Sequence, residues 1–313
     1  MNRLPAEQEK RLFQLKQEVT KRGFDRHASI LKDTTELPPE LQSSAVIKVT
    51  SDIAIETIIL FPPQLHRGWD YIPKQALLFT STGMIHLLAS IWPDQEPRLT
   101  SIKGHDFIYM NVKLLLLYGL LEIVACGQTS PVRLGMEFNT VAWYKLSEPL
   151  RKLLQSTRPK PDISPDDVDC SPDVQQTFAE LPLKFSNGVK IYGLLPGEQL
   201  VDLVFQPGVW KRWLHFSRQP VIANTLLMLT SNYMVIIREE LKVSQGWVLT
   251  YIPRACIAEM QCGPGVNTHD ELIVKLERGD QKADYKISLN SEYVEAWHLL
   301  WSRHGDSCTN LSI

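Results

Sequence analysis

The stretch DELIVKLERGDQKADYKISLNSEYVEAWHLLW, residues 270 to 301, decides the fold more than any other part of the chain. Apolar and polar residues alternate on both sides of a turn at Gly279 and Asp280, which predicts a β-hairpin with one buried face. That face consists of Leu272, Val274, Leu276, Tyr285, Ile287 and Leu289. Asn290 and Ser291 are residues that cap helices, and after them the apolar residues follow a helical period. A hairpin followed directly by a helix is therefore expected.

The helix after the hairpin carries an aromatic stripe. Val294, Trp297 and Trp301 recur at intervals of three and four residues, so they share one helical face. Such a face needs an apolar sheet to cover. In the first half of the chain, the segment SEPLRKLL from Ser147 is expected to do the same on a shorter helix, through Leu150, Leu153 and Leu154. We expect a curved antiparallel sheet closed at one end by a C-terminal helix.

The two halves of the chain also resemble each other. LLFTSTGMI (residues 77–85) matches LMLTSNYMV (residues 227–235), and both predict a strand, a turn and a second strand. Three further blocks follow the same order: Phe61-Pro-Pro with Phe205-Gln-Pro, Tyr144-Lys-Leu-Ser with Tyr285-Lys-Ile-Ser, and the two terminal helical segments. Matches in a constant order predict an internal duplication. The alternative is two unrelated β-rich domains.

The duplication sets the expected domain boundaries. The segment 156–188 is rich in proline and aspartate, which predicts an acidic, extended linker. Leu12, Leu15 and Val19 recur at helical spacing near the start of the chain and predict an amphipathic helix. The expected parts are 1–45, the N-terminal helix and connection; 46–155, the first module; 156–188, the linker; 189–305, the second module; and 306–313, a tail.

Composition limits the class of protein. The 313 residues carry a net charge of −2, so there is no overall positive field that would draw the chain onto nucleic acid or an anionic bilayer, and only a local basic patch could do so. The start has no apolar run of signal-peptide length, and Lys113 and Glu122 interrupt the most apolar stretch. Five cysteines are an odd and sparse set, which favours reduced thiols. We expect a cytoplasmic chain with no transmembrane segment. Peripheral association with the membrane is the alternative location.

The apolar run LLLLYGLLEIVAC, residues 114–126, has two interpretations. A partner groove or a membrane-inserting segment would leave it exposed. A buried strand pair in the first module, with Gly119 at a bend or bulge, is the interpretation we favour.

A meander of short strands that ends in one helix resembles the pleckstrin-homology (PH) superfold, particularly the bacterial PH-like domains. LLPGEQLVDLVFQ (residues 194–206) is similar to their first strand, TSNYMVII (230–237) to a recurrent hairpin, and the tryptophan helix to the capping helix. The resemblance implies a β-rich fold (mainly β, or α+β) of two PH-like antiparallel barrels, each capped by a C-terminal helix, plus the N-terminal helix. It also implies binding of lipids, peptides or proteins rather than catalysis.

The candidate site lies in VWKRWLHFSRQ, residues 209–219, where basic and aromatic residues are interleaved. In PH-like domains this first hairpin often holds the basic residues that receive an anionic headgroup. Lysine and arginine suit phosphate, and tryptophan suits a membrane interface. The candidate residues are Lys211, Arg212, Trp213, His215 and Arg218. The alternative is a strand whose aromatic residues enter the core while its basic residues face water.

Other chemistry is weakly supported. Cys256, Cys262, His298 and His304 could be assembled into a metal site, but their spacing is not that of metal ligands, and core cysteines are expected instead. No hydrolase, phosphate-loop or dinucleotide motif occurs in the chain. We expect no cofactor and no catalysis. The preferred function is an intracellular scaffold with protein partners; the alternative is a peripheral membrane protein that binds anionic lipid headgroups through the second module.

Overall fold

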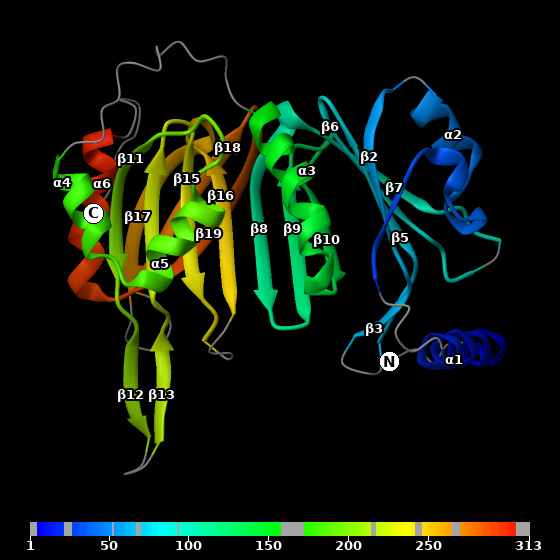
Figure 1. Ribbon diagram of the computed structural model, residues 1–313, viewed down its shortest axis with the longest axis horizontal. Helices are drawn as coiled ribbons and strands as arrows, with labels where there is room; N and C mark the ends of the chain where they lie inside the picture. Colours follow the sequence, from blue (N-terminus) through cyan, green and yellow to red (C-terminus); the bar gives the residue numbers. More distant parts are fainter. Residues whose placement is uncertain are drawn as a thin grey trace. The chain divides into compact units, whose positions relative to one another are not determined.

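The computed structural model describes residues 5–21, 27–51, 53–66, 70–92, 94–157, 172–213, 217–241, 246–264 and 270–304 (Figure 1). At positions 51, 66, 212–213, 217–219, 264 and 304 it describes the backbone alone. The fold is β-rich, with several antiparallel sheets and six α-helices among these residues. The chain forms two compact units: unit 1 comprises 1–104 and 138–156, and unit 2 comprises 105–137 and 157–313.

Unit 1 contains an antiparallel sheet in the order β1-β2-β5-β6-β7 and a separate hairpin, β3–β4. The strands are β1 (Ser29–Leu31), β2 (Ile55–Phe61), β3 (Gln64–His66), β4 (Asp70–Ile72), β5 (Gln75–Thr80), β6 (Gly83–Leu88) and β7 (Arg98–Lys103). The helices are α1 (Ala6–Lys21), α2 (Ser44–Ser51) and α3 (Trp143–Ser156), with short 3-10 turns η1 (Thr34–Glu36), η2 (Pro39–Leu41) and η4 (Thr140–Ala142). The expected N-terminal helix is therefore present.

Helical segments bury apolar residues of the unit 1 sheet. Val46 of α2 and Leu41 of η2 join one core cluster with Ile58, Leu78 and Ile85 of the strands. Helix α3 packs against β2 and β6 and buries its leucines, as expected for a capping helix. It begins four residues earlier than the sequence suggested. The buried leucines are Leu146, Leu150, Leu153 and Leu154.

Unit 2 contains a seven-stranded antiparallel sheet in the order β10-β9-β8-β16-β15-β14-β11, and a three-stranded sheet, β17-β18-β19. The strands are β8 (Phe107–Leu115), β9 (Tyr118–Ala125), β10 (Val132–Phe138), β11 (Leu200–Gln206), β14 (Thr225–Thr230), β15 (Tyr233–Glu239), β16 (Trp247–Pro253), β17 (Ile257–Pro264), β18 (Asp270–Arg278) and β19 (Gln281–Leu289). The helices are α4 (Pro172–Glu180), α5 (Leu183–Gly188), the π-helical turn η6 (Val189–Gly193) and α6 (Val294–His304).

The sequence pattern predicted the second half of unit 2 well. The β18–β19 hairpin forms with Val274 opposite Tyr285, and α6 follows it. Trp297 and Trp301 are buried in one core cluster with residues of both sheets, which confirms the covering role expected of the aromatic stripe. That cluster also contains Ile108, Tyr109 and Val124 of β8 and β9.

The two halves repeat the same order of elements. Each has four antiparallel strands (β2, β5, β6, β7 and β11, β14, β15, β16), then three (β8–β10 and β17–β19), then a helix. The matched hairpins agree in register, because Met84 faces Phe79 and Met234 faces Leu229. Before each helix an asparagine, Asn139 or Asn290, caps a 3-10 turn, the second being η8 (Ser291–Tyr293).

Two of the sequence matches are not structurally equivalent. Tyr144 lies in α3, whereas Tyr285 lies in β19, so their shared tetrapeptide is coincidental. Phe61 pairs with Gln75 at the end of β2, but in the second half the corresponding end residue is Gln206 rather than Phe205. The aligned block is therefore shifted by one residue, which places the two phenylalanines on opposite faces of their sheets.

The strands of the first half do not stay together. The run 114–126 contains only the end of β8, a turn with exposed Leu116 and Leu117, and β9, so it is one strand of hairpin β8–β9 rather than the expected buried strand pair. Gly119 pairs regularly with Leu114, and the irregularity lies between Phe107 and Tyr109. β8 is hydrogen-bonded to β16, so β8–β10 extend the sheet of the second half. No closed barrel is formed by the residues that the structure describes. Residues 172–188 of the expected extended linker are helical instead.

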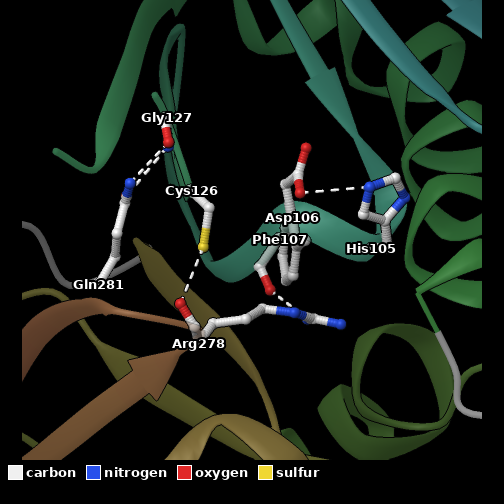
Figure 2. Close-up of polar contacts among 7 residues, drawn as sticks. All are labelled: His105, Asp106, Phe107, Cys126, Gly127, Arg278 and Gln281. Carbon is white, nitrogen blue, oxygen red and sulfur yellow. Dashed lines mark hydrogen bonds and ion pairs between the residues drawn. The ribbon is translucent and has the colours of Figure 1, made fainter. Parts of the chain in front are cut away.

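Polar contacts hold the first-half strands against the β18–β19 turn within unit 2 (Figure 2). The guanidinium of Arg278 donates to the carbonyl of Phe107 at 2.5 Å. The side-chain amide of Gln281 accepts from the N–H of Gly127 at 2.9 Å and donates to its carbonyl at 2.6 Å. The thiol of Cys126 donates to the carbonyl of Arg278. These bonds pair backbone groups of the first-half strands with side-chain and backbone groups at the β18–β19 turn.

Candidate functional site

The predicted site falls on a hairpin that projects from unit 2. Strands β12 (Val209–Trp213) and β13 (Ser217–Ile222) continue from β11 and into β14, and form a separate two-stranded ribbon. Lys211 lies opposite Gln219 and Arg212 lies opposite Arg218. Figure 1 shows the ribbon extending beyond the end of the seven-stranded sheet. The structure thus brings the backbones of four candidate residues together, at Lys211, Arg212, Trp213 and Arg218.

Two of the described side chains on this hairpin, Trp210 and Lys211, face water, whereas Ile222 at its base is buried. Lys211 is exposed, and Trp210 is 57% exposed. Trp210 therefore does not enter the core, contrary to the alternative interpretation of this segment. Arg212, Trp213 and Arg218 are described by their backbones alone, and His215 lies outside the described residues. Trp210 is not one of the predicted site residues, because its exposure depends on how far the hairpin projects from the sheet.

The hairpin is locally basic although the chain is slightly acidic. Between Gln206 and Asn224 the sequence contains one lysine, two arginines and one histidine, with no aspartate or glutamate. A charge cluster of this kind is screened beyond about 10 Å at ordinary ionic strength, so it acts on whatever approaches the hairpin closely. The arrangement suits an anionic surface or an acidic partner segment.

The counterpart of this hairpin in the first half is covered. Hairpin β3–β4 lies between β2 and β5 in the sequence, as β12–β13 lies between β11 and β14. Helix α1 packs against both β3 and β4, with Leu12 and Leu15 partly buried and Val19 buried. Lys74, a basic residue after this hairpin, pairs with Glu40 at 3.0 Å. The first hairpin of the first half is therefore covered by a helix, whereas the first hairpin of the second half exposes Trp210 and Lys211.

Among the cysteines that the structure describes in unit 2, Cys256 is buried and Cys126 and Cys262 are partly buried. Burial raises the pKa of the Cys256 thiol, and Arg278 donates to its sulfur at 3.4 Å. Burial also raises the pKa of Cys262, with a further contribution from Asp270. Groups of three or more His, Cys, Asp or Glu side chains that could hold a metal ion are absent from the described part of the chain. The geometry gives these thiols a packing role.

One hollow occurs on unit 1, with a volume of about 250 Å³. It is lined by His27, Ala28, Val141, Ala142, Tyr144 and Lys145. The amine of Lys145 donates to the carbonyl of Ala28, and it also lies 5.3 Å from the ring centre of Tyr144. Because the lysine is already engaged by the protein, we regard this hollow as part of the anchoring of the segment before β1.

A comparison with models of known protein families finds no match, and a comparison with curated proteins finds no significant similarity. Within the described residues, no helix is both long enough and apolar enough to cross a lipid bilayer. The geometry of the β12–β13 hairpin is therefore the main basis for a functional proposal.

Proposed function

We propose that the chain is a non-enzymatic binding protein made of two PH-like modules, and that the second module recognises anionic lipid headgroups through the β12–β13 hairpin. The observation that carries this proposal is the 57% exposure of Trp210 beside the exposed Lys211 on a projecting basic ribbon. An exposed aromatic side chain counts toward a binding surface when it lies among residues that suit the same partner, as Trp210 does among the basic residues of this hairpin. Tryptophan, with an apolar body and a polar N–H, suits the boundary between headgroups and acyl chains.

The PH-like interpretation is supported by the order of elements. Four strands, three strands and a capping helix follow one another in both halves, and both helices begin after an asparagine-capped turn. In this proposal the last three strands of the first module, β8–β10, belong to the same sheet as strands of the second module. That sharing distinguishes the chain from two separate barrels joined by a linker.

The chemistry of the hairpin fits phosphate. A lysine acts as a point charge and an arginine as a planar donor fork, so the residue types at Lys211, Arg212 and Arg218 suit a phosphate-bearing headgroup. Each basic residue near an anionic leaflet contributes about 1 kcal/mol. Losing two of them should therefore weaken binding by about 2 kcal/mol, or about 30-fold.

A protein-binding scaffold is the second candidate function, and one observation favours it. The chain already packs its own helix α1 on the equivalent hairpin, β3–β4. A helix of another protein could cover β12–β13 in the same way.

Vesicle co-sedimentation tests the lipid proposal. Vesicles of phosphatidylcholine with phosphatidylserine or a phosphoinositide are compared with pure phosphatidylcholine vesicles, and the Lys211→Ala/Arg212→Ala variant is expected to bind about 30-fold more weakly. The matched control is Lys282→Ala/Lys286→Ala, which removes two charges from the exposed side of β19. Absence of binding by the wild type, or equal loss in the control, would contradict the proposal.

A further inference from the structure

The β12–β13 hairpin is one of three connections at the same end of unit 2. Strand registers fix this arrangement, because each antiparallel pair places the end of one strand beside the start of the next. The pairs at this end are Gln206 with Thr225, Glu239 with Trp247, Trp247 with Leu114, and Leu114 with Gly119. The ends of β11, β15 and β8, and the starts of β14, β16 and β9, therefore lie at one end of the sheet, as Figure 1 shows.

Each of the three connections exposes a large apolar side chain. Leu116 and Leu117 in the β8–β9 turn are 65% and 71% exposed. Leu241, which begins the connection after β15, is 41% exposed, and Trp210 on the hairpin is 57% exposed. The turn and the β15–β16 connection lie in contact, since a Cβ atom built on Gly246 would come within 2.3 Å of the Leu115 side chain. The apolar residues thus belong to one end of a single compact unit.

The β8–β9 turn combines backbone strain with exposed apolar side chains. Leu116 has a φ angle of 40°, a left-handed conformation that glycine and asparagine adopt with much less strain. A two-residue turn in a hairpin usually carries those residues for that reason. Leu116 therefore adds backbone strain at the tip, and both Leu116 and Leu117 bury little of their own surface. Strain of this kind together with exposed apolar surface marks a functional segment.

Two acidic residues near this end are paired with lysines. Glu240 pairs with Lys113, and Glu239 pairs with Lys184, both at 2.5 Å. These two carboxylates therefore do not oppose the basic hairpin as unpaired charges. A surface that combines basic residues with exposed leucines and a tryptophan has the composition of a segment that lies in a membrane interface.

We propose that Leu116, Leu117 and Leu241 insert into the bilayer interface beside Trp210, so that the membrane-binding surface draws on both halves of the chain. This inference rests on the proposed recognition of anionic lipid by the hairpin. The hairpin supplies attraction to the headgroups, and the leucines supply a hydrophobic anchor that does not depend on charge. Because β8–β9 come from the first half, neither half alone contains the complete surface.

The test compares vesicle binding with binding of a soluble headgroup. The Leu116→Asn/Leu117→Asn variant keeps the turn, since asparagine tolerates a positive φ. It is expected to bind anionic vesicles at least about tenfold more weakly, and to lose most of the binding that persists in high salt. Its affinity for inositol trisphosphate, measured by calorimetry, should equal that of the wild type. Leu299→Asn on α6, a residue that is 45% exposed, is the control and should change neither.

The outcomes separate this inference from the proposed function. If the leucine variant binds vesicles like the wild type while Lys211→Ala/Arg212→Ala does not, the inference is wrong and headgroup recognition stands. If the wild type binds the soluble headgroup but no vesicles, insertion is excluded. If the wild type binds neither, both proposals fail. If the substitution changes only the oligomeric state, measured by light scattering, the leucines form a protein contact and the inference is again wrong.

Discussion

His86 should make the stability of unit 1 depend on pH. Its side chain lies in β6, is only 6% exposed, and contacts the amide oxygen of Gln75 at 3.0 Å. Burial, together with the nearby charge of Arg98, lowers its pKa from 6.5 to about 4. Between these values the unfolded chain binds a proton that the folded chain excludes, so the free energy of unfolding falls as the pH falls from about 7 to about 4. At 1.36 kcal/mol per pH unit the loss amounts to about 3 kcal/mol.

Urea denaturation at several pH values between 4 and 7 measures this loss, and NMR titration of the His86 ring carbons measures the pKa directly. The His86→Gln variant is the control, because glutamine can still hydrogen-bond to Gln75 but does not titrate in this range. The variant should show a pH dependence that is flatter by about 3 kcal/mol over the same window. A His86 pKa near 6.5 in the folded protein, or equal slopes for the two proteins, would refute the reasoning.

Two further substitutions address unit 2. Trp297→Ala should lower the free energy of unfolding by about 3–5 kcal/mol, because it empties a fully buried site. Trp297→Phe should lower it much less, since the indole N–H has no hydrogen-bond partner among the described residues. If urea denaturation shows equal losses of unfolding free energy for the alanine and phenylalanine variants, the indole group itself stabilises unit 2 and this reasoning is wrong. Gln281→Glu keeps the acceptor for Gly127 N–H but removes the donor to Gly127 carbonyl, and should cost about 1–3 kcal/mol at neutral pH. The raised pKa of the new carboxyl group should restore stability below about pH 4, where protonation supplies a donor again; a loss that is the same at all pH values would contradict this account.

The local elements could be predicted from the sequence because side-chain periodicity determines them. Alternation around Gly279 specifies the β18–β19 hairpin, and the spacing of Trp297 and Trp301 specifies the covering helix α6. The matched hairpins at Thr80 and Thr230 were found for the same reason. In each case the relevant interaction lies within a few residues of the chain.

The pairing of distant strands could not be predicted in the same way. β8 and β16 are joined by backbone hydrogen bonds, which are chemically alike at every residue, so no side chain in Val112 or Leu249 indicates the partner strand. The identity of Tyr144 and Tyr285 was misleading, because four matching letters do not specify a strand or a helix. Helices α4 and α5 were missed because prolines and aspartates dominate the segment before them.

The sequence predicts which segment forms the candidate site, but not how exposed that segment is or which other turns lie at the same end of the sheet. Composition alone marks Lys211, Arg212 and Arg218 as a basic cluster. The exposure of Trp210 and the shared end with Leu117 follow from the sheet registers, which are not visible in the sequence.

The position of β8–β10 in the sheet of unit 2 affects both the folding of the chain during synthesis and the division of the gene into two halves. During synthesis these three strands leave the ribosome before any other strand of their sheet, so β8 offers a preformed edge on which β16 later completes the sheet. A gene cut at the boundary between the two halves would remove three strands from unit 2 and leave β16 with an open edge that favours aggregation. Two halves joined in this way cannot be separated without breaking the sheet of unit 2.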